Sequence, residues 1–208
     1  MAISLKMSGK EVVNYNPTTD IATIKNTNID SNVQFPAGHI VQVKQTVIKN
    51  HDITTTSSSY VPMQKGDGTS PFAVTHACTS GNKVLIHFVI VFGASNGSSY
   101  GAPQLWIGPS DGSSAMAVSE FISDDNAATT NQSKSSAASF YMSHSVELNS
   151  MTNQFLYTPS TTTELKYQLY WRKGAESTTL YLNRTGAHNN NANGSVGIST
   201  MTLYEIAG

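Results

Sequence analysis

The sequence predicts an all-β protein of antiparallel strands, and three observations lead to this fold class. Several segments alternate apolar and polar residues with period two, as half-buried strands do, and almost nothing repeats at helical spacing. Long polar loops with few charges separate these segments, at residues 94–103, 123–138 and 186–194. A chain of 208 residues, of which 38% are hydrophobic, is long and apolar enough to form one all-β domain with a buried core.

The N-terminal part of the chain is patterned more weakly than the rest. Only Val12, Val13 and residues 21–24 indicate strands there. We therefore expect an N-terminal arm over residues 1–36 and a single β-sandwich domain over residues 37–208.

The strand expected over residues 84–92 is apolar on both faces, with His87 as its one polar member. One face of an antiparallel sheet usually meets water. The second face of this strand therefore needs a cover, which either another part of the same chain or a neighbouring subunit supplies. The sequence leaves both alternatives open.

A hairpin is expected where residues 104–107 and 115–121 flank the turn sequence Gly-Pro-Ser-Asp-Gly at 108–112. A short helix over residues 115–122 is the alternative. Further strands are expected from alternation or from apolar spacing, at residues 41–47, 139–148, 165–172, 180–182 and 198–206. In the run at 139–148 the alternation places His144 on the apolar face.

The composition argues against a nucleic-acid partner. Charged residues make up 12% of the chain, whereas an ordinary domain has about 25%. Lys and Arg number 12 against 13 Asp and Glu, and no basic cluster is present to displace counterions from phosphates. The polar surface comes instead from 27 Ser, 23 Thr and 17 Asn, close to a third of the chain.

No apolar run approaches the ~20 residues that a membrane helix needs, and the first residues lack the apolar region of a signal peptide. We therefore expect no membrane insertion and synthesis in the host cytoplasm. The single cysteine, Cys78, forms no internal disulfide, and we interpret it as a small core residue.

Motifs that would indicate an enzyme or a metal site are weak. The pattern Gly-x-Ser-x-Gly occurs at Ser95 and Ser110, but neither serine is followed by a convincing helix, as a nucleophile elbow requires. The six histidines include no pair at zinc-ligand spacing, and His87 and His144 are interpreted as core or interface residues. We expect no catalytic residue, no cofactor and no metal site formed by one chain. A metal ion bound by three copies of one histidine on the axis of a trimer stays open.

The polar loops are the expected places for binding, because a sheet fixes their ends while their sequence is free to vary. Aromatic rings beside Asn and Ser side chains have the chemistry to stack on sugars. The candidate loop contacts are Tyr60, Asn96, Tyr100, Asn126, His188 and Asn190.

Several short strings of the sequence, taken in order, resemble the terminal β-sandwich domains of bacteriophage fibre and virion-surface proteins. These strings are residues 80–86, 104–121, 165–172, 180–184 and 199–208. The ending Thr-Leu-Tyr-Glu-Ile-Ala, preceded by Tyr-Leu-Asn-Arg and an Asn-rich loop, carries most of the resemblance. It covers His39 to Gly208 and implies a jelly-roll-like sandwich, a homotrimer and display on a virion, with no catalytic residues.

The function that this resemblance implies is that of a non-enzymatic bacteriophage structural protein on the virion surface. Because only about 36 residues precede the sandwich, we expect a capsid decoration (cement) protein or a head fibre, bound to the major capsid or another virion protein through the N-terminal arm. A tail-fibre-type protein that attaches to a host surface glycan is the alternative. A free carbohydrate-binding module and a glycan hydrolase are weaker hypotheses.

Overall fold

The chain divides into two compact units, Met1–Pro36 and Ala37–Gly208. The structure is a computed structural model, and it describes residues 3–7, 10–16, 21–24, 36–67, 69–96, 99–118, 121, 135–136, 140–174, 178–187 and 194–208. In the first unit, β1 (Ile3–Met7), β2 (Lys10–Asn16) and β3 (Ile21–Ile24) form an antiparallel sheet in that order.

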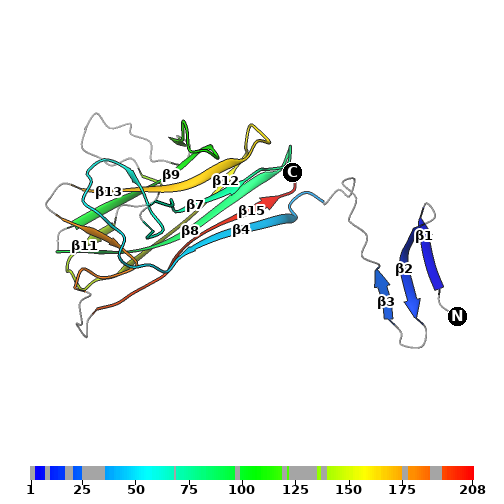
Figure 1. Ribbon diagram of the computed structural model, residues 1–208, viewed down its shortest axis with the longest axis horizontal. Coiled ribbons are helices and arrows are strands. Elements are labelled where there is room, and N and C mark those ends of the chain that lie inside the picture. The colour runs from blue at the N-terminus through cyan, green and yellow to red at the C-terminus, as the bar shows by residue number, and fades with distance from the viewer. Residues whose placement is uncertain are drawn as a thin grey trace. The chain divides into compact units, whose positions relative to one another are not determined.

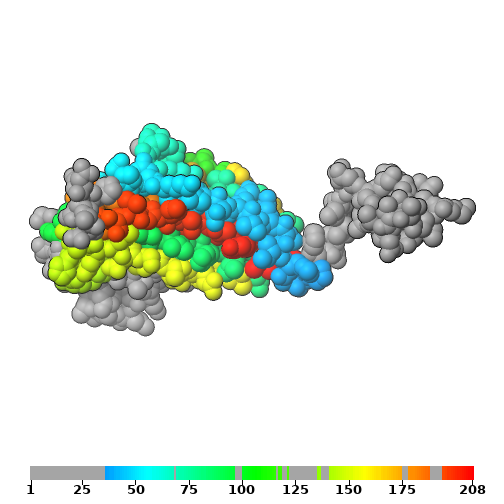
Figure 2. All heavy atoms as spheres, turned by 90° about the horizontal axis from the view of Figure 1, so that it is seen from below, coloured from blue at the N-terminus to red at the C-terminus, as the bar shows by residue number. Residues whose placement is uncertain are grey.

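The second unit consists of two antiparallel sheets, which confirms the all-β prediction (Figure 1). In the first sheet, β4 (Ile40–Ile48), β15 (Ser199–Ile206), β8 (Lys83–Ala94) and β12 (Asn149–Tyr157) lie side by side. Figure 2 shows these four strands as neighbouring stripes along one face of the molecule. The short strands β14 (Leu180–Leu182) and β5 (Thr54–Thr55) extend this sheet beside the end of β8.

The second sheet is centred on β9 (Ser99–Pro109) and β13 (Leu165–Lys173), which pair along their whole lengths. The edge of β13 opposite β9 pairs first with β7 (Ala73–His76) and then with β6 (Val61–Pro62). The other edge, along β9, pairs with β10 (Met116–Ala117) and β11 (Phe140–Met142). Among the described residues no α-helix occurs, and therefore no helix that is long and apolar enough to cross a membrane.

The order of the strands is that of a jelly roll. The chain crosses between the sheets repeatedly, so that β4, β8, β12 and β15 belong to one sheet and β7, β9, β10, β11 and β13 to the other. The resulting orders, β4-β15-β8-β12 and β7-β13-β9-β10, are those of two interlocked Greek keys. The core lies between the inner faces, where the ring of Phe92 on β8 stacks against Trp171 on β13 with centroids 6.0 Å apart.

The strand predicted at residues 84–92 has one dry face and one mixed face. Its inward residues, such as Ile86 and Phe88, are completely buried, whereas Leu85 and Val89 on the outer face are only half-buried. Part of the outer face is covered by the same chain, because the backbone at Gly197 packs closely on Val91. A Cβ added at Gly197 would lie only 2.7 Å from the side chain of Val91.

Two predicted boundaries are wrong. Residues 94–103 are mostly strand rather than loop, because β8 continues to Ala94 and β9 begins at Ser99. The strand predicted at 139–148 ends at Met142, where the backbone N–H and hydroxyl of Ser143 both donate to the carboxylate of Glu147. These bonds close a turn, so the alternation that continues past Met142 does not reflect a sheet.

The hairpin prediction is confirmed in the described part of the chain. Met116 pairs with Ile107, and Ala117 pairs with Trp106. The turn between the two strands is closed by a 2.9 Å hydrogen bond from the N–H of Gly112 to the carbonyl of Pro109.

Candidate functional site

One end of the sandwich gathers three of the six candidate loop contacts; we call it the loop end. Here the end of β8 meets the segment before β14, through a hydrogen bond from Ser95 N–H to the carbonyl of Thr179. The end of β13 meets the segment before β6 in the same way, because Lys173 N–H donates to the carbonyl of Ser57. Tyr60, Asn96 and Tyr100 lie in or beside these segments.

Of the two tyrosines among these three residues, Tyr100 has the more accessible ring. It is 38% exposed and lies on strand β9 rather than in a loop. Its ring covers the backbone at Gly174, where a Cβ would come within 1.8 Å of Cε2. The glycine therefore provides the space that this ring occupies at the surface.

Tyr60 and Asn96 are held by neighbouring side chains. The guanidinium of Arg172 lies 5.3 Å from the ring centroid of Tyr60, and burial raises the pKa of the phenol although Arg172 lowers it in part. The Oδ1 of Asn96 accepts a 2.9 Å hydrogen bond from the hydroxyl of Thr178. The other three candidates, Asn126, His188 and Asn190, lie outside the described residues.

Two histidines that the sequence places on apolar faces have different surroundings. His87 lies on the outer face of β8, with Nε2 3.1 Å from the hydroxyl of Thr152. His144 lies in the turn after β11, is exposed, and has Nδ1 3.3 Å from Glu147. His144 is therefore not a core residue, because the predicted strand ends before it, and its interpretation as an interface residue stays a prediction.

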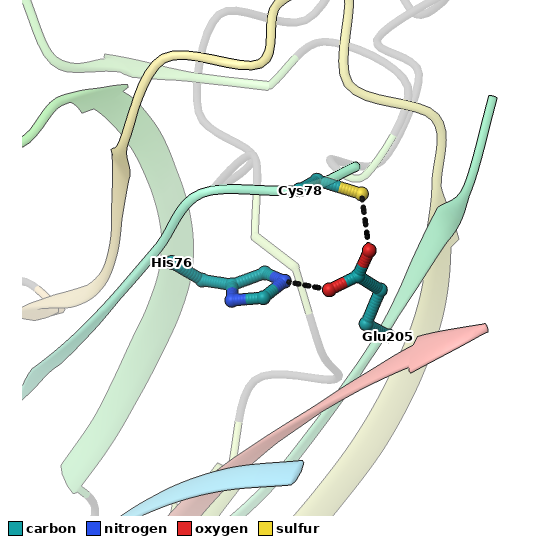
Figure 3. A group of neighbouring side chains, drawn as sticks. All are labelled: His76, Cys78 and Glu205. Atoms are coloured by element: carbon teal, nitrogen blue, oxygen red, sulfur yellow. Dashed lines mark hydrogen bonds and ion pairs between the residues drawn. The ribbon is translucent and has the colours of Figure 1, made fainter. Parts of the chain in front are cut away.

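A second group of polar residues is buried at the opposite end of the sandwich, near the C-terminus. His76 ends strand β7, Cys78 follows in the connection to β8, and Glu205 points inward from β15 (Figure 3). We call these three residues the His-Cys-Glu cluster. The arrangement follows from the fold, because the jelly roll brings the last strand beside β8 and so beside the β7–β8 connection.

All three side chains of the His-Cys-Glu cluster are almost completely removed from solvent. The Nε2 of His76 lies 3.0 Å from Oε2 of Glu205, and Sγ of Cys78 lies 3.8 Å from Oε1. The three possible ligand atoms all lie within 4.8 Å of one another. His76 is only 2% exposed; its Nε2 pairs with Glu205, whereas its Nδ1 makes no hydrogen bond in the described part of the chain.

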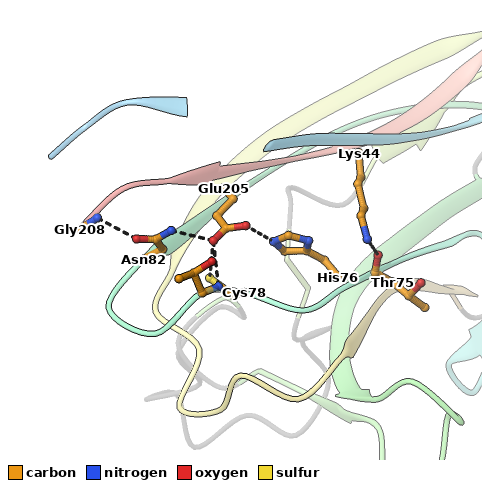
Figure 4. Close-up of polar contacts among 8 residues, drawn as sticks. Lys44, Thr75, His76, Cys78, Asn82, Glu205 and Gly208 are labelled. Carbon is orange, nitrogen blue, oxygen red and sulfur yellow. Dashed lines mark hydrogen bonds and ion pairs between the residues drawn. The ribbon is translucent and has the colours of Figure 1, made fainter. Parts of the chain in front are cut away.

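The carboxylate of Glu205 is oriented by two further donors (Figure 4). Its Oε1 accepts hydrogen bonds from the N–H of Thr79 at 2.8 Å and from the amide of Asn82 at 2.7 Å. Asn82 in turn accepts a 3.2 Å bond from the N–H of Gly208, so the C-terminal residue belongs to the same network.

These surroundings set the charge states of the cluster. Burial acts to raise the pKa of Glu205, but the hydrogen bonds from Asn82 and Thr79 and the nearby His76 outweigh it and lower the pKa below its ordinary value. Burial, together with the charge of Glu205, raises the pKa of the Cys78 thiol to about 11. The cluster thus combines an ionised carboxylate with an imidazole and a thiol, which are three donors that hold transition metals.

The interpretation of Cys78 as a buried core residue is confirmed, but its polar neighbours are not evident from local spacing. His76 and Cys78 are two residues apart, a spacing that places both on one side of an extended chain. Glu205 is 127 residues after Cys78 in the sequence, so only the fold reveals that it completes the group.

No protein-family model and no curated protein matches the chain. Among solved structures, a chain in the structure of infectious bursal disease virus, Gx strain, is similar, with a TM-score of 0.40 and 13% sequence identity. The match covers 81% of this chain and 38% of the virus chain, so this chain spans well under half of the length of that neighbour.

Proposed function

We propose that this protein is a non-enzymatic structural component of a bacteriophage virion, displayed on the particle surface as a capsid decoration protein or head fibre. The observation that carries the proposal is that the start of the sandwich and the candidate loop contacts lie at opposite ends of it. The sandwich begins at one end, and three of the six candidate contacts, Tyr60, Asn96 and Tyr100, lie at the other. Such a domain is suited to attachment at one end and display at the other.

The attachment end is defined by backbone hydrogen bonds. Gly38 N–H donates to the carbonyl of Ala207 at 2.9 Å, and Ala207 N–H donates to the carbonyl of His39 at 2.8 Å. The first residues of the sandwich therefore lie beside its own C-terminus. We propose that the unit Met1–Pro36 is the part that binds the major capsid protein or another virion protein.

The jelly-roll winding is compatible with this role, since it recurs in viral capsid domains as well as in lectins. A fold does not determine a function by itself, so the proposal depends on the arrangement of the ends. The serines of the two Gly-x-Ser-x-Gly patterns have local structural roles that fit a non-enzymatic protein. The Oγ of Ser95 accepts the N–H of Thr179, and Ser110 lies in the β9–β10 turn.

We further propose that the sandwich assembles as a homotrimer. Strand β4 forms one edge of its sheet within the described residues, and it exposes three aliphatic side chains, Ile40, Val43 and Val47. A long edge strand with an apolar surface favours association with another chain. A second copy that covers this edge would also account for the half-buried outer residues of β8.

Attachment to a host surface glycan is a second candidate function, and the exposed ring of Tyr100 favours it. A flat aromatic surface beside the hydroxyl and amide groups of the loop end has the chemistry to stack on a sugar ring. Saturable binding of host polysaccharide, lost in Tyr100→Ala, would support this function. Binding that is unchanged by this substitution would contradict a role of Tyr100.

The experiment that tests the main proposal is localisation on purified particles. Antibodies against residues 37–208 should label virions at regular capsid positions. A chain that lacks residues 1–36 should fold, as its circular dichroism would show, but should not be incorporated into particles. Label on the tail would instead favour the attachment function. Absence of the protein from particles would contradict the proposal. Unchanged incorporation of the truncated chain would contradict the assignment of residues 1–36 as the attachment arm.

A further inference from the structure

We propose that His76, Cys78 and Glu205 bind one zinc ion, which would fasten the last strand, β15, to the connection between β7 and β8. The proposal concerns a buried site at the end of the sandwich opposite the loop end, and it is independent of the proposed virion role. Its basis is the donor set, the separation of the donor atoms and the polar groups left without hydrogen bonds.

The three donors are those that proteins use for zinc. Zinc binds His nitrogen and carboxylate oxygen at about 2.0–2.2 Å and Cys sulfur at about 2.3 Å, usually in a tetrahedron. Ligand atoms around such an ion are then roughly 3.3–3.8 Å apart. The Nε2 of His76 and Oε2 of Glu205 are 3.0 Å apart, and all three possible ligand atoms lie within 4.8 Å of one another, so small side-chain movements would admit the ion.

The buried polar groups give a second, independent indication. The Nδ1 of His76 lacks a hydrogen bond among the described residues, although the side chain is 2% exposed, while Nε2 is paired with Glu205. Buried polar atoms nearly always have partners, and a bound ion is one accepted reason when no partner is found within the chain. The hydroxyl of Tyr167, which is within electrostatic reach of Cys78 and Glu205, is also buried without a hydrogen bond.

The carboxylate is already oriented for this role. Thr79 and Asn82 both donate to Oε1 of Glu205, which leaves Oε2 directed toward Nε2 of His76 (Figure 4). Donors behind a ligand that fix its orientation are a regular feature of metal sites. The connection over the cluster is exposed at residues 79–81, which gives the ion a short path from solvent.

The charges also balance. Binding would require the Cys78 thiol to release its proton to solvent, because only the thiolate is a zinc ligand. One thiolate and one carboxylate then offset the two positive charges of the ion, with a neutral imidazole as third ligand. A water molecule would take the fourth position. In this charge-neutral arrangement no buried charge is left uncompensated.

The test uses the full chain, freed of metal with a chelator and then titrated with Zn²⁺ in competition with a chromophoric chelator. We expect saturation at one zinc per chain and a higher midpoint of thermal unfolding. Co²⁺ in place of Zn²⁺ should give visible bands of tetrahedral cobalt and a near-ultraviolet thiolate-to-cobalt band. The absence of stoichiometric binding, or a cobalt spectrum without the thiolate band, would overturn the proposal without any variant.

Variants then test the ligand set. Cys78→Ser should abolish the thiolate band, and Asn82→Ala, which removes a donor behind Glu205, should weaken zinc binding by about 10- to 100-fold. His144→Gln is the matched control, because His144 pairs with Glu147 at the surface with no thiol nearby, and it should bind zinc as the unsubstituted chain does. Zinc binding of unchanged affinity in folded Cys78→Ser, or loss of zinc binding in His144→Gln, would show that the ion binds elsewhere.

Discussion

The hydroxyl of Ser199 donates a 2.6 Å hydrogen bond to Oδ1 of Asn183, and both residues are completely buried. The amide nitrogen of Asn183 donates to the carbonyls of Ile48 and Asn50, at 2.9 and 3.0 Å. Asn183 also has a positive φ of 61°, in the left-handed region that asparagine tolerates better than most residues. One side chain thus joins β15, the end of β4 and the turn after β14.

Replacement of Asn183 by alanine should therefore destabilise the sandwich strongly. Buried carbonyls that lose their donor cost about 1–3 kcal/mol, and alanine in the left-handed region adds about 1 kcal/mol. We expect Asn183→Ala to lower the free energy of unfolding by about 2–4 kcal/mol, measured by urea denaturation. Asn183→Gly relieves the backbone strain and should be less destabilising by about 1 kcal/mol; equal losses in the two variants would show that strain at this position is unimportant.

Two glycines without positive φ should respond very differently to the same substitution. A Cβ at Gly93 would lie 2.0 Å from the carbonyl oxygen of Arg184, a backbone atom of the segment after β14 that forms an isolated bridge with Val196. A Cβ at Gly174 would meet the ring of Tyr100, an exposed side chain that is able to turn away. We expect Gly93→Ala to cost about 3 kcal/mol in unfolding free energy and Gly174→Ala about 1 kcal/mol or less. Similar losses would mean that the Tyr100 ring is fixed rather than mobile.

Much of the sandwich is predictable from the sequence because its long strands have one wet and one dry face. The alternation at residues 165–172 correctly gives Tyr167, Leu169 and Trp171 as the buried face of β13. The same criterion fails at 139–148, since a turn closed by Ser143 and Glu147 continues the alternation by chance. It also fails at Ser99 to Pro103, where glycine, alanine and proline hide a strand.

The two sites differ in how far the sequence reveals them. The loop end could be anticipated, because Tyr60, Asn96 and Tyr100 lie at or near strand ends and strand ends meet at the edges of sheets. The His-Cys-Glu cluster could not, since it depends on β15 lying beside β8, a pairing of distant segments that local patterns do not specify. Histidine spacing alone indicates metal sites only where the ligands are close in sequence.

The turn after β11 provides a prediction about pH. Hydrogen bonds from the hydroxyl and N–H of Ser143 lower the pKa of Glu147 from its ordinary value of 4.5 to about 2. A lowered folded-state pKa stabilises the fold at pH values above 4.5, and this contribution is lost as the pH falls toward 2. Because Glu147 is at the surface, its share of the total stability is small, so we expect the effect to be visible by titration rather than by unfolding.

NMR of the side-chain carboxyl should give the pKa of Glu147 directly. Ser143→Ala should raise that pKa toward 4.5, because it removes the hydroxyl donor. Asp67 is an internal control, since its pKa of about 2 depends on Ser70 in a different turn and should not change. A pKa of Glu147 that is the same with and without the Ser143 hydroxyl would contradict this account of the turn.

The edge strand β4 leads to a prediction about self-association. Val43 and Val47 are 53% and 42% exposed, and their side chains lie on one face of the strand, four residue pairs apart in the register with β15. A lysine at either position would leave the inner face unchanged but would place a charge where we propose that a second copy packs. We expect the unsubstituted chain to sediment as a trimer and the Val43→Lys/Val47→Lys variant to sediment as a folded monomer.

The comparison needs a variant that adds charge elsewhere. Ser160 is exposed in the connection between β12 and β13, so Ser160→Lys should change the net charge without touching β4 and should leave the trimer intact. Sedimentation velocity distinguishes the species, and circular dichroism confirms that each variant is folded. A trimer that survives both valine substitutions would place the contact on another surface, and an unsubstituted chain that stays monomeric at all concentrations would refute self-assembly. Because burial of the β4 edge removes apolar surface from water, loss of the trimer should be accompanied by a lower midpoint of thermal unfolding.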